Sequence, residues 1–484
     1  MIGLKVSRLA RALLLAGAAS LVAGPALADE LRDALALAYQ TNPTLQSARA
    51  QQRAVDENVP IARSAGLPSL NGTVTYTEYL KTSSNSFTSP SRSFDANSQL
   101  GVPIYTGGAV KNSVRAATTR VEAGQADLRG VESGVFSQVV AAYMDVILAQ
   151  EVVKLNRANG QRLEVNLQAS RDRFEIGDLT RTDVAQSQSR LSLVRGQTRS
   201  AEANLIAARE RYIQLVGKAP IDLQTPPPLA GLPASAGEAV GIALDHNPDL
   251  LAARQRSKAA DFDVRVAGAG KLPKVSIFAG AGYSDYLGTL GGSGPGTFTQ
   301  NSTTAQAGVR ATIPIFQGGL PAAQRRAAQA REDATMETEI GVERAVVANV
   351  RSAYAQWQAA QSVIGSSQTA VDAAALSLEG VRAENTVGNR TILDILNAEN
   401  ELLTAQVQVA TARRNAYVAG FNLLAAMGKA EARDLGLDGG ALYDPQVNYE
   451  RVHNKIWDWS EDPDPATEST RTVDTPAQDG SVAP

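Results

Sequence analysis

The apolar residues between positions 342 and 364 recur at intervals of three and four. An average interval of about 3.5 residues is typical of helices that pack together as a coiled coil. The same stripe of apolar positions occurs 211 residues earlier, from Val131 to Val153. The pattern predicts two long helices, over about 109–175 and 320–386. At a rise of 1.5 Å per residue, each would be roughly 100 Å long.

Each long helix is expected to end at a turn and to return as a second helix. The first turn contains Ile176-Gly177, and its helix returns to about Val216. The second contains Val387-Gly388, and its helix returns to about Met427. The second returning helix carries two apolar stripes, which indicates neighbouring helices on both sides, as in the wall of a cylinder.

Four shorter segments have a period of two. In residues 303–316 small apolar residues alternate with polar ones, and further extended segments lie at about 69–79, 95–105 and 274–286. This period is typical of strands with one apolar and one polar face. We expect the apolar face to point outward and the polar face inward, as in a transmembrane β-barrel. A strand of a soluble β-sandwich has the same alternation, so the strands alone leave that alternative open.

Several short motifs occur twice in the same order. Asn42-Pro43 is repeated at Asn247-Pro248, and VPIYTGG at 102–108 is repeated as IPIFQGG at 313–319. We therefore predict two units, residues 29–229 and 230–435, each with a helix (31–65 or 236–270), two strands and a long helical hairpin. Paired glycines at the strand-to-helix corners indicate a backbone turn that a Cβ would strain. The corner residues are Pro103, Gly107, Gly108, Pro314, Gly318 and Gly319.

The two ends of the chain differ from these units. Residues 1–28 combine a basic start, a short apolar run and the sequence Ala26-Leu27-Ala28, as in a cleaved secretory signal peptide. The apolar run is shorter than the roughly 20 residues that span a bilayer. Residues 436–484 have no counterpart in the repeat, and their richness in Asp, Pro, Ser and Thr predicts a disordered tail.

The composition argues against several classes of function. The 484 residues include no cysteine and two histidines, which excludes thiol chemistry and disfavours a histidine-based metal centre. The net charge of −3 argues against a nucleic-acid partner. GAGK at 268–271 resembles a fragment of a phosphate-binding loop, but Leu272 stands where Ser or Thr is needed. We expect no enzymatic activity, no catalytic residues, no metal and no cofactor.

Four strands are too few to close a barrel. Open sheet edges are not tolerated in a membrane, because their N–H and C=O groups find no partner there. The smallest natural barrels have about eight strands, so several copies must share one barrel. Three copies would supply twelve strands and a matching helical cylinder, although two or four copies are also possible.

The Asn-Pro segments, the doubled PI[YF]xGG corners and the doubled [IV]G…T…D turns together resemble the TolC-like outer-membrane efflux proteins of Gram-negative bacteria. The resemblance covers about residues 30–435. It implies a mixed α and β membrane protein: a homotrimer with a 12-stranded barrel, four strands per chain, in outer-membrane lipid, continued by a long α-helical coiled-coil tunnel in the periplasm.

The same resemblance implies export from the periplasmic side in a tripartite efflux or type I secretion system. Its partners would be a periplasmic adaptor protein and an inner-membrane ABC or proton-driven transporter. The alternative is a trimeric coiled-coil surface protein or adhesin without transport, which explains the heptads and the signal peptide but not the paired amphipathic strands. The sequence does not identify the exported substrate, because a tunnel has no substrate-specific pocket.

The hairpin turns are the candidate periplasmic gate. Thr180 with Asp183, and Thr391 with Asp394, match the pattern of a capped helix start, so capping alone is the alternative to a role of these carboxylates in the gate. We expect an adaptor to dock on the hairpin tips. The tip residues are Ile176, Gly177, Val387 and Gly388.

The resemblance also assigns roles near these turns. Arg390 would bond Thr182 and Asp183 of a neighbouring hairpin and hold the mouth shut, and Asp394 would belong to an acidic ring that favours cations. Asn385 stands where many relatives have a latching Tyr, and Asn397 where some have a second Asp. The latch would then be weaker, and the ring would have one carboxylate fewer per chain.

Overall fold

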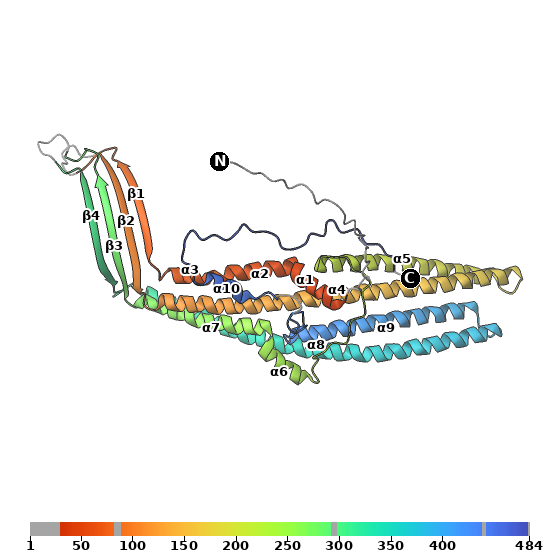
Figure 1. Ribbon diagram of the computed structural model, residues 1–484. Helices are drawn as coiled ribbons and strands as arrows, with labels where there is room; N and C mark the ends of the chain where they lie inside the picture. Colours follow the sequence, from red (N-terminus) through yellow and green to blue (C-terminus); the bar gives the residue numbers. More distant parts are fainter. Residues whose placement is uncertain (1–29, 82–88, 292–297, 438–441, 483–484) are drawn as a thin grey trace, which may run out of the picture.

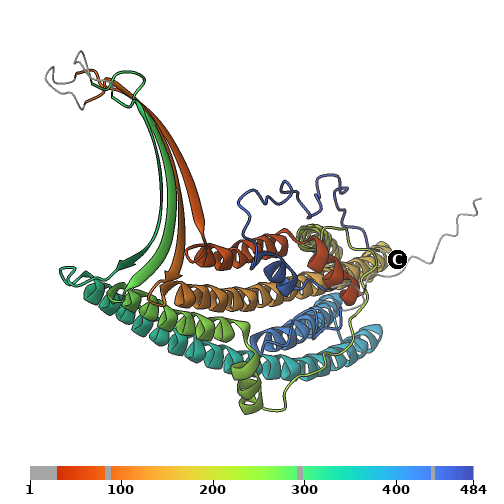
Figure 2. The ribbon, with the colours of Figure 1, turned by 60° about the vertical axis from the view of Figure 1, so that its left-hand side comes forward.

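The computed structural model describes residues 30–81, 89–291, 298–437 and 442–482. The predicted signal peptide, residues 1–28, lies outside them. The described chain is elongated, with a four-stranded sheet at one end and two long helical hairpins at the other (Figure 1). In a view turned by 60°, the strands curve away from the helices as one ribbon (Figure 2).

The two long helices are present as predicted. Helix α4 spans Ala109–Glu175 and α8 spans Leu320–Thr386, with 67 residues each. Helices α5 (Arg181–Val216) and α9 (Ile392–Ala426) return beside them. Both hairpins point to the same end of the molecule, away from the sheet (Figure 1). One stretch of α4 is long and apolar enough to cross a membrane, but half of it is buried within the chain, as in a core helix.

The helices expected over 31–65 and 236–270 are broken, which corrects that prediction. The first is divided into α1 (Leu31–Thr41), α2 (Pro43–Asp56) and α3 (Asn58–Ser64). The second is divided into α6 (Ala236–His246), α7 (Pro248–Gly268) and the 3-10 turn η1 (Ala269–Lys271). Asn42 and Asn247 have ψ angles of 123° and 122°. A proline drives the preceding residue out of the helical region, so both Asn-Pro pairs interrupt a helix.

The same two asparagines join helices end to end. Asn42 accepts hydrogen bonds from the first N–H groups of α2, and its Nδ2 donates to the Leu215 carbonyl at the end of α5 over 2.9 Å. Asn247 caps α7 in the same way and donates to the Ala426 carbonyl at the end of α9 over 2.9 Å. Each side chain satisfies polar groups of two helix ends at once. Helix α5 is therefore stacked on α2, and α9 on α7.

The largest hydrophobic core surrounds these joints. Tyr143 of α4 and Tyr212 of α5 are buried there with their rings 6.4 Å apart. The Tyr143 hydroxyl donates to the Gln224 carbonyl over 2.7 Å. In the other half of the chain, the Tyr354 hydroxyl donates to the Ala234 carbonyl over 2.9 Å. These bonds hold the segment that links α5 to α6 against both long helices.

One antiparallel sheet contains all four strands in sequence order. The strands are β1 (Ser69–Glu78), β2 (Arg92–Tyr105), β3 (Lys274–Asp285) and β4 (Asn301–Thr312). Strands β2 and β3 pair at the centre and join the two halves of the chain. The last strand was expected to reach residue 316 but ends at Thr312. Pro314 follows shortly after, and a proline cannot donate to a strand ladder.

The register gives the sheet one apolar and one polar face. One row across the four strands contains Leu70, Leu100, Ala279 and Ala307. The next row contains Asn71, Gln99, Gly280 and Gln306. Neighbouring rows point to opposite faces, so each strand contributes to the apolar face and to the polar face. The four strands together have the two-sided character of a membrane-barrel wall.

Both strand-to-helix corners turn on paired glycines. Gly107 and Gly108 have φ angles of +67° and +82°, and Gly318 and Gly319 have +57° and +82°, the left-handed region that favours glycine. Pro103 lies at an irregularity in the β2–β3 register, and Pro314 lies in the segment after β4. A Cβ on Gly107 would lie 2.9 Å from that of Leu272, whereas one on Gly318 would have no neighbour within 4 Å.

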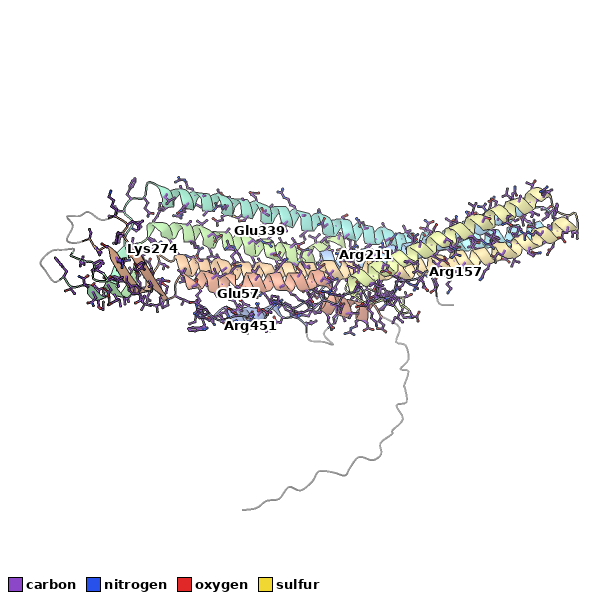
Figure 3. All side chains as sticks on the ribbon, turned by 90° about the horizontal axis from the view of Figure 1, so that it is seen from above. Glu57, Arg157, Arg211, Lys274, Glu339 and Arg451 are labelled. Carbon is purple, nitrogen blue, oxygen red and sulfur yellow. The ribbon has the colours of Figure 1, made fainter. Side chains whose placement is uncertain are left out.

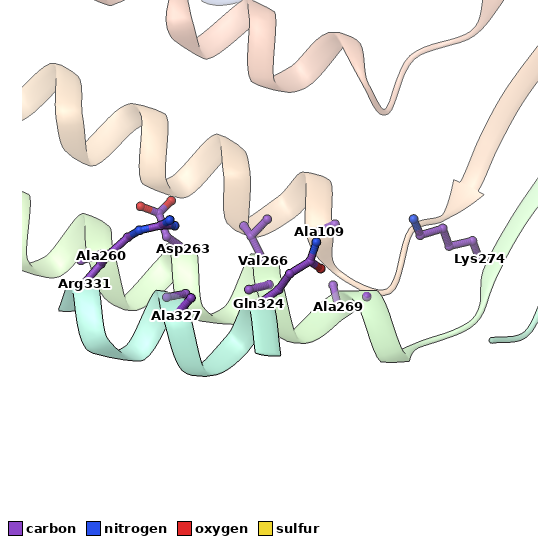
Figure 4. Close-up of a pocket in the computed structure, with 12 residues that line it drawn as sticks. Ala109, Ala260, Asp263, Val266, Ala269, Lys274, Gln324, Ala327 and Arg331 are labelled. Carbon is purple, nitrogen blue, oxygen red and sulfur yellow. The ribbon is translucent and has the colours of Figure 1, made fainter. Parts of the chain in front are cut away.

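A cavity of about 590 Å³ lies beside the first corner, between the start of α4, α7 and α8. Alanines form much of its lining, and the Arg331 side chain of α8 extends toward Asp263 of α7 (Figure 4). Asp263 itself forms an ion pair with Arg120 of α4. The cavity is thus a gap between helices whose charged groups lie at its edge.

The C-terminal tail is more ordered than its composition predicts. Helix α10 spans Pro445–Val452 and packs on α2. Asn448 donates to the buried Asp56 carboxylate over 2.7 Å, and Val452 is buried. Viewed from above, Arg451 lies on the side of the molecule near Glu57 (Figure 3). The predicted disorder is therefore wrong for this helix, because tertiary contacts supply the burial that the local sequence lacks.

Candidate functional site: the hairpin tips

The two hairpin tips have the same backbone turn. Gly177 and Gly388 have φ angles of +84° and +80°. The N–H of Asp178 donates to the Arg173 carbonyl over 2.9 Å, and that of Asn389 to the Glu384 carbonyl over 3.0 Å. These bonds are typical of a helix that ends on a left-handed glycine. Ile176 and Val387 are 79% and 70% exposed, so each tip presents an apolar side chain to its surroundings.

Each returning helix begins with a complete capping box, as the sequence predicted. Asp183 accepts from the Thr180 hydroxyl over 2.7 Å and from its N–H over 2.9 Å. These two bonds hold the pKa of Asp183 below its usual range. Thr182, which lies between Thr180 and Asp183 in the sequence, is exposed.

The second tip repeats this arrangement. Asp394 accepts from the Thr391 N–H over 2.9 Å and from its hydroxyl over 2.8 Å. The pKa of Asp394 is lowered by these bonds, the backbone bond first, and further by the charge of Arg390. Both carboxylates are therefore charged caps at neutral pH, at the end of the molecule farthest from the sheet (Figure 1).

Arg390 pairs within its own hairpin in this single chain. Its Nε donates to Glu384 over 2.7 Å, and Glu384 raises the pKa of Arg390. The expected bonds to Thr182 and Asp183 involve a neighbouring hairpin, and here both of Asp183's bonds come from its own capping threonine. Asn385 donates its side-chain amide to the Arg390 carbonyl over 2.7 Å and so stabilises the loop that carries the arginine.

Asn397 links the two hairpins. Its Oδ1 accepts from Arg190 Nη2 over 2.8 Å, which connects α9 to α5. The Asn397 amide thus holds a cation of the other hairpin. Asn397 is therefore placed by the structure at a contact between hairpins.

Sequence reasoning missed a buried carboxylate nearby. Glu399 of α9 is only 1% exposed. It accepts from Asn166 of α4 over 3.0 Å and from Arg382 of α8 over 2.8 Å. The sequence repeat gave a signal for this carboxylate. Arg171 and Gln188, 211 residues before Arg382 and Glu399, form the corresponding hydrogen-bonded pair in the first hairpin over 2.9 Å. Aligning the two hairpins would have revealed an amide in one and an acid in the other.

Among the described residues, no group of three or more His, Cys, Asp or Glu side chains is placed to hold a metal ion. The polar groups of the tips instead bond one another and cap helices. Their arrangement suits the control of a passage by charge and by packing, and its chemistry is that of reversible ion pairs.

The chain belongs to the outer membrane efflux protein family, whose model matches residues 34–218 and 239–429. It is 34% identical over 447 residues to the outer membrane efflux protein BepC of Brucella suis biovar 1, covering 92% of this chain and 95% of the relative. It is 29% identical over 444 residues to the outer membrane protein TolC of Escherichia coli, covering 88% of this chain and 87% of the relative.

Solved structures of such channels share the fold. The Campylobacter jejuni CmeC outer membrane channel superimposes with a TM-score of 0.72 at 18% identity, over 88% of this chain and 89% of that one. The open state of the Neisseria gonorrhoeae MtrE channel superimposes with a TM-score of 0.66 at 21% sequence identity, over 82% of this chain and 88% of that one. The protein is an outer-membrane channel-tunnel of efflux or type I secretion, and the family assignment favours this function over the coiled-coil stalk.

Proposed function

We propose that three copies of this chain form one channel, with a 12-stranded barrel and a helical tunnel gated at the periplasmic tips. The observation that carries the proposal is the sheet itself. Within the described chain, β1 and β4 are paired on one side only, and one face is predominantly apolar. Exposed strand edges cannot persist in lipid, so β1 of one copy pairs with β4 of the next.

The proposal extends to the organisation of each chain. Residues 29–229 and 230–435 act as two versions of one unit, so a trimer has six hairpins around its mouth. The equal lengths of α4 and α8, the shared Asn-Pro joints and the identical capping boxes support this. Alternation of two similar hairpins gives the ring two kinds of interface, each with its own polar contacts.

The gate consists of the charged and polar groups at these tips. Arg390 exchanges Glu384 for Thr182 and Asp183 of a neighbouring hairpin when the mouth closes, while Asp394 faces the passage and favours cations. Asn385 supports the Arg390 loop, and Asn397 holds Arg190. A guanidinium suits this exchange because it forms directed bonds with either carboxylate.

The exposed tips are the docking surface for a periplasmic adaptor, through Ile176-Gly177 and Val387-Gly388. An inner-membrane ABC or proton-driven transporter completes the path. Named relatives include the Pseudomonas aeruginosa alkaline protease secretion protein AprF and the Cupriavidus metallidurans cobalt-zinc-cadmium resistance protein CzcC. Relatives therefore serve both protein and small-solute export, and we assign this chain to the shared step, passage across the outer membrane.

Native mass spectrometry of the detergent-extracted protein tests the assembly. We expect a mass three times that of the mature chain, and channels that conduct ions after insertion into planar bilayers. A stable monomer that conducts nothing would refute the proposal. A trimer without conductance would support the assembly alone. The recordings would then be repeated with adaptor protein, and a trimer that still conducts nothing would reject the channel.

A further inference from the structure

An ion pair closes a loop directly after α10. Arg451 Nη1 and Nη2 donate to the two carboxylate oxygens of Asp462 over 2.6 and 2.8 Å. Lys455 Nζ donates to the same carboxylate over 3.1 Å. A bidentate contact of this kind fixes direction as well as distance. Residues 451–462 therefore form a closed loop with a charged neck.

The tip of this loop carries large apolar side chains in solvent. Ile456, Trp457 and Trp459 are 69%, 72% and 80% exposed. The Ser460 N–H donates to the Trp457 carbonyl over 3.1 Å, which forms a turn at the tip. Two of the three tryptophans of the chain are thus displayed within three residues. Clustered exposed apolar groups of this size mark a contact surface.

The loop is held beside the junction of helices and sheet. Arg63 of α3 donates to the His453 carbonyl over 3.4 Å and bonds the side chain of Asn454. Arg63 lies six residues before Ser69, where β1 begins. Gly66, between them, packs against Val110 in the first turn of α4. The neck of the loop is therefore at the level where strands pass into helices.

Two views agree on this position. The dark blue coil that follows α10 turns close to the junction of α3 and β1 in Figure 1 and again in Figure 2. Apolar side chains are also exposed at this end of the strands: Tyr105, the last residue of β2, is 47% exposed, and Phe316, in the segment that follows β4, is 88% exposed. The apolar face of the sheet is the lipid-facing surface of an outer-membrane channel, so this level is the periplasmic rim of the membrane.

We propose that the loop Arg451–Asp462 places Trp457 and Trp459 in the headgroup layer of the periplasmic leaflet, as a membrane contact separate from the barrel. Tryptophan favours this layer because its ring is apolar and its N–H donates to polar neighbours. Asp458 and Glu461 flank the aromatic tip. Their charge disfavours an anionic surface, so the occupant is a zwitterionic phospholipid such as phosphatidylethanolamine.

Tryptophan emission tests the proposal on the assembled protein. In a Trp357→Phe variant, Trp457 and Trp459 are the remaining tryptophans. The protein is placed in nanodiscs of phosphatidylethanolamine with or without bromine on the acyl chains next to the headgroup. Because tryptophans at the interface lie beside these bromines, we expect emission to fall about twofold in the brominated discs.

A matched variant provides the control. Trp457→Phe with Trp459→Phe keeps Trp357, which lies 37 residues into α8, roughly 55 Å from the corner at 1.5 Å per residue. Its emission should be equal in both kinds of disc. Asp462→Asn loosens the neck and should reduce the quenching of the loop tryptophans.

Two results would overturn the proposal. Equal emission of the loop tryptophans with and without bromine would show that they do not contact lipid. If their spectrum nevertheless indicated an apolar environment, the tip of the loop would be packed against protein. Quenching that appears only when phosphatidylglycerol replaces phosphatidylethanolamine would contradict the zwitterionic occupant.

Discussion

Asn166 of α4 and Glu399 of α9 are joined by a hydrogen bond of 3.0 Å at a point where the carboxylate is almost completely buried. The bond connects the first hairpin to the second, and Arg382 neutralises the carboxylate from α8. Burying a charge costs free energy unless partners compensate it. The contact between hairpins near the mouth therefore depends on a small polar group inside the helical wall.

We predict that Arg382→Ala destabilises the protein by about 2–3 kcal/mol, because it leaves a buried carboxylate without its cation. The side chain of Arg382 is 48% exposed, which keeps the loss below that of a completely buried pair. Arg171→Ala is the matched control: it removes the same contact from neutral Gln188 and should cost less than about 1 kcal/mol.

Thermal unfolding of the purified variants in one detergent measures this difference. Adding Glu399→Gln to Arg382→Ala should recover most of the lost Tm, because the amide needs no counter-ion. Equal Tm values for Arg382→Ala and Arg171→Ala would mean that Glu399 is not held as a buried charge.

Arg390→Ala should raise single-channel conductance in planar bilayers severalfold, since the closed mouth loses its proposed bridge to Asp183. Glu384→Gln should lower it, because Arg390 then loses its partner in the same hairpin and is available to the neighbour. Arg173→Ala, at the first tip, removes the pair with Asp178 and a charge that acts on Asp183, but it leaves Arg390 in place and should change conductance less than Arg390→Ala. If Arg390→Ala conducts like the parent in intact trimers, the gate lies elsewhere.

Asp394→Ala should reduce the cation preference of the channel, measured as a reversal potential across a salt gradient. The pKa of Asp394 lies below the ordinary 3.8 in the folded protein. The parent should therefore keep its preference from pH 7 to about pH 4 and lose it at lower pH. A depressed folded pKa also means that the cap's stabilisation is present above the unfolded pKa and is lost as the pH falls through the folded value.

A preference for cations that disappears between pH 7 and pH 5 would contradict this assignment, since neither Asp183 nor Asp394 changes charge there. The same recordings on Asp183→Ala show whether the two carboxylates contribute equally.

Gly107→Ala should reduce the yield of assembled trimer in the outer membrane more than Gly318→Ala. Both substitutions place a side chain in the left-handed region at a cost of about 1–2 kcal/mol. The first also forces a Cβ to 2.9 Å from Leu272, whereas the second meets nothing within 4 Å. Heat-modifiable bands on a gel quantify the trimers, and equal yields would show that the corner adapts to the clash.

Much of the architecture could be predicted because it depends on periodicity. The interval of 3.5 residues located α4 and α8 at their observed bounds, and the two capping boxes marked the starts of α5 and α9. The spacing of apolar residues and the capping residues are both local signals. They depend on residues within a few turns of the same helix, so they can be read from a short stretch of sequence.

The features that sequence missed depend on contacts between distant segments. The helix break at Asn42-Pro43 was a local signal that the sequence analysis overlooked, whereas the joint between Asn42 and the end of α5 depends on a contact 173 residues away. Glu399 has the sequence context of an ordinary helical acid, and its burial follows from Asn166, 233 residues away. Helix α10 is stabilised in the same way by Asp56 of α2.

The two asparagine joints give the wall of the tunnel unequal stiffness. Alongside each unbroken helix of 67 residues runs a rod of two pieces, in contact through side-chain hydrogen bonds instead of a continuous peptide backbone. Bending an unbroken helix disrupts its internal ladder, whereas a shift at a joint breaks no helix hydrogen bond and instead changes side-chain contacts around Asn42 or Asn247. Helices α5 and α9 can therefore shift at the joints beside Asn42 and Asn247 without breaking a helix, whereas α4 and α8 carry any displacement of the tips along their whole length toward the strand-to-helix corners.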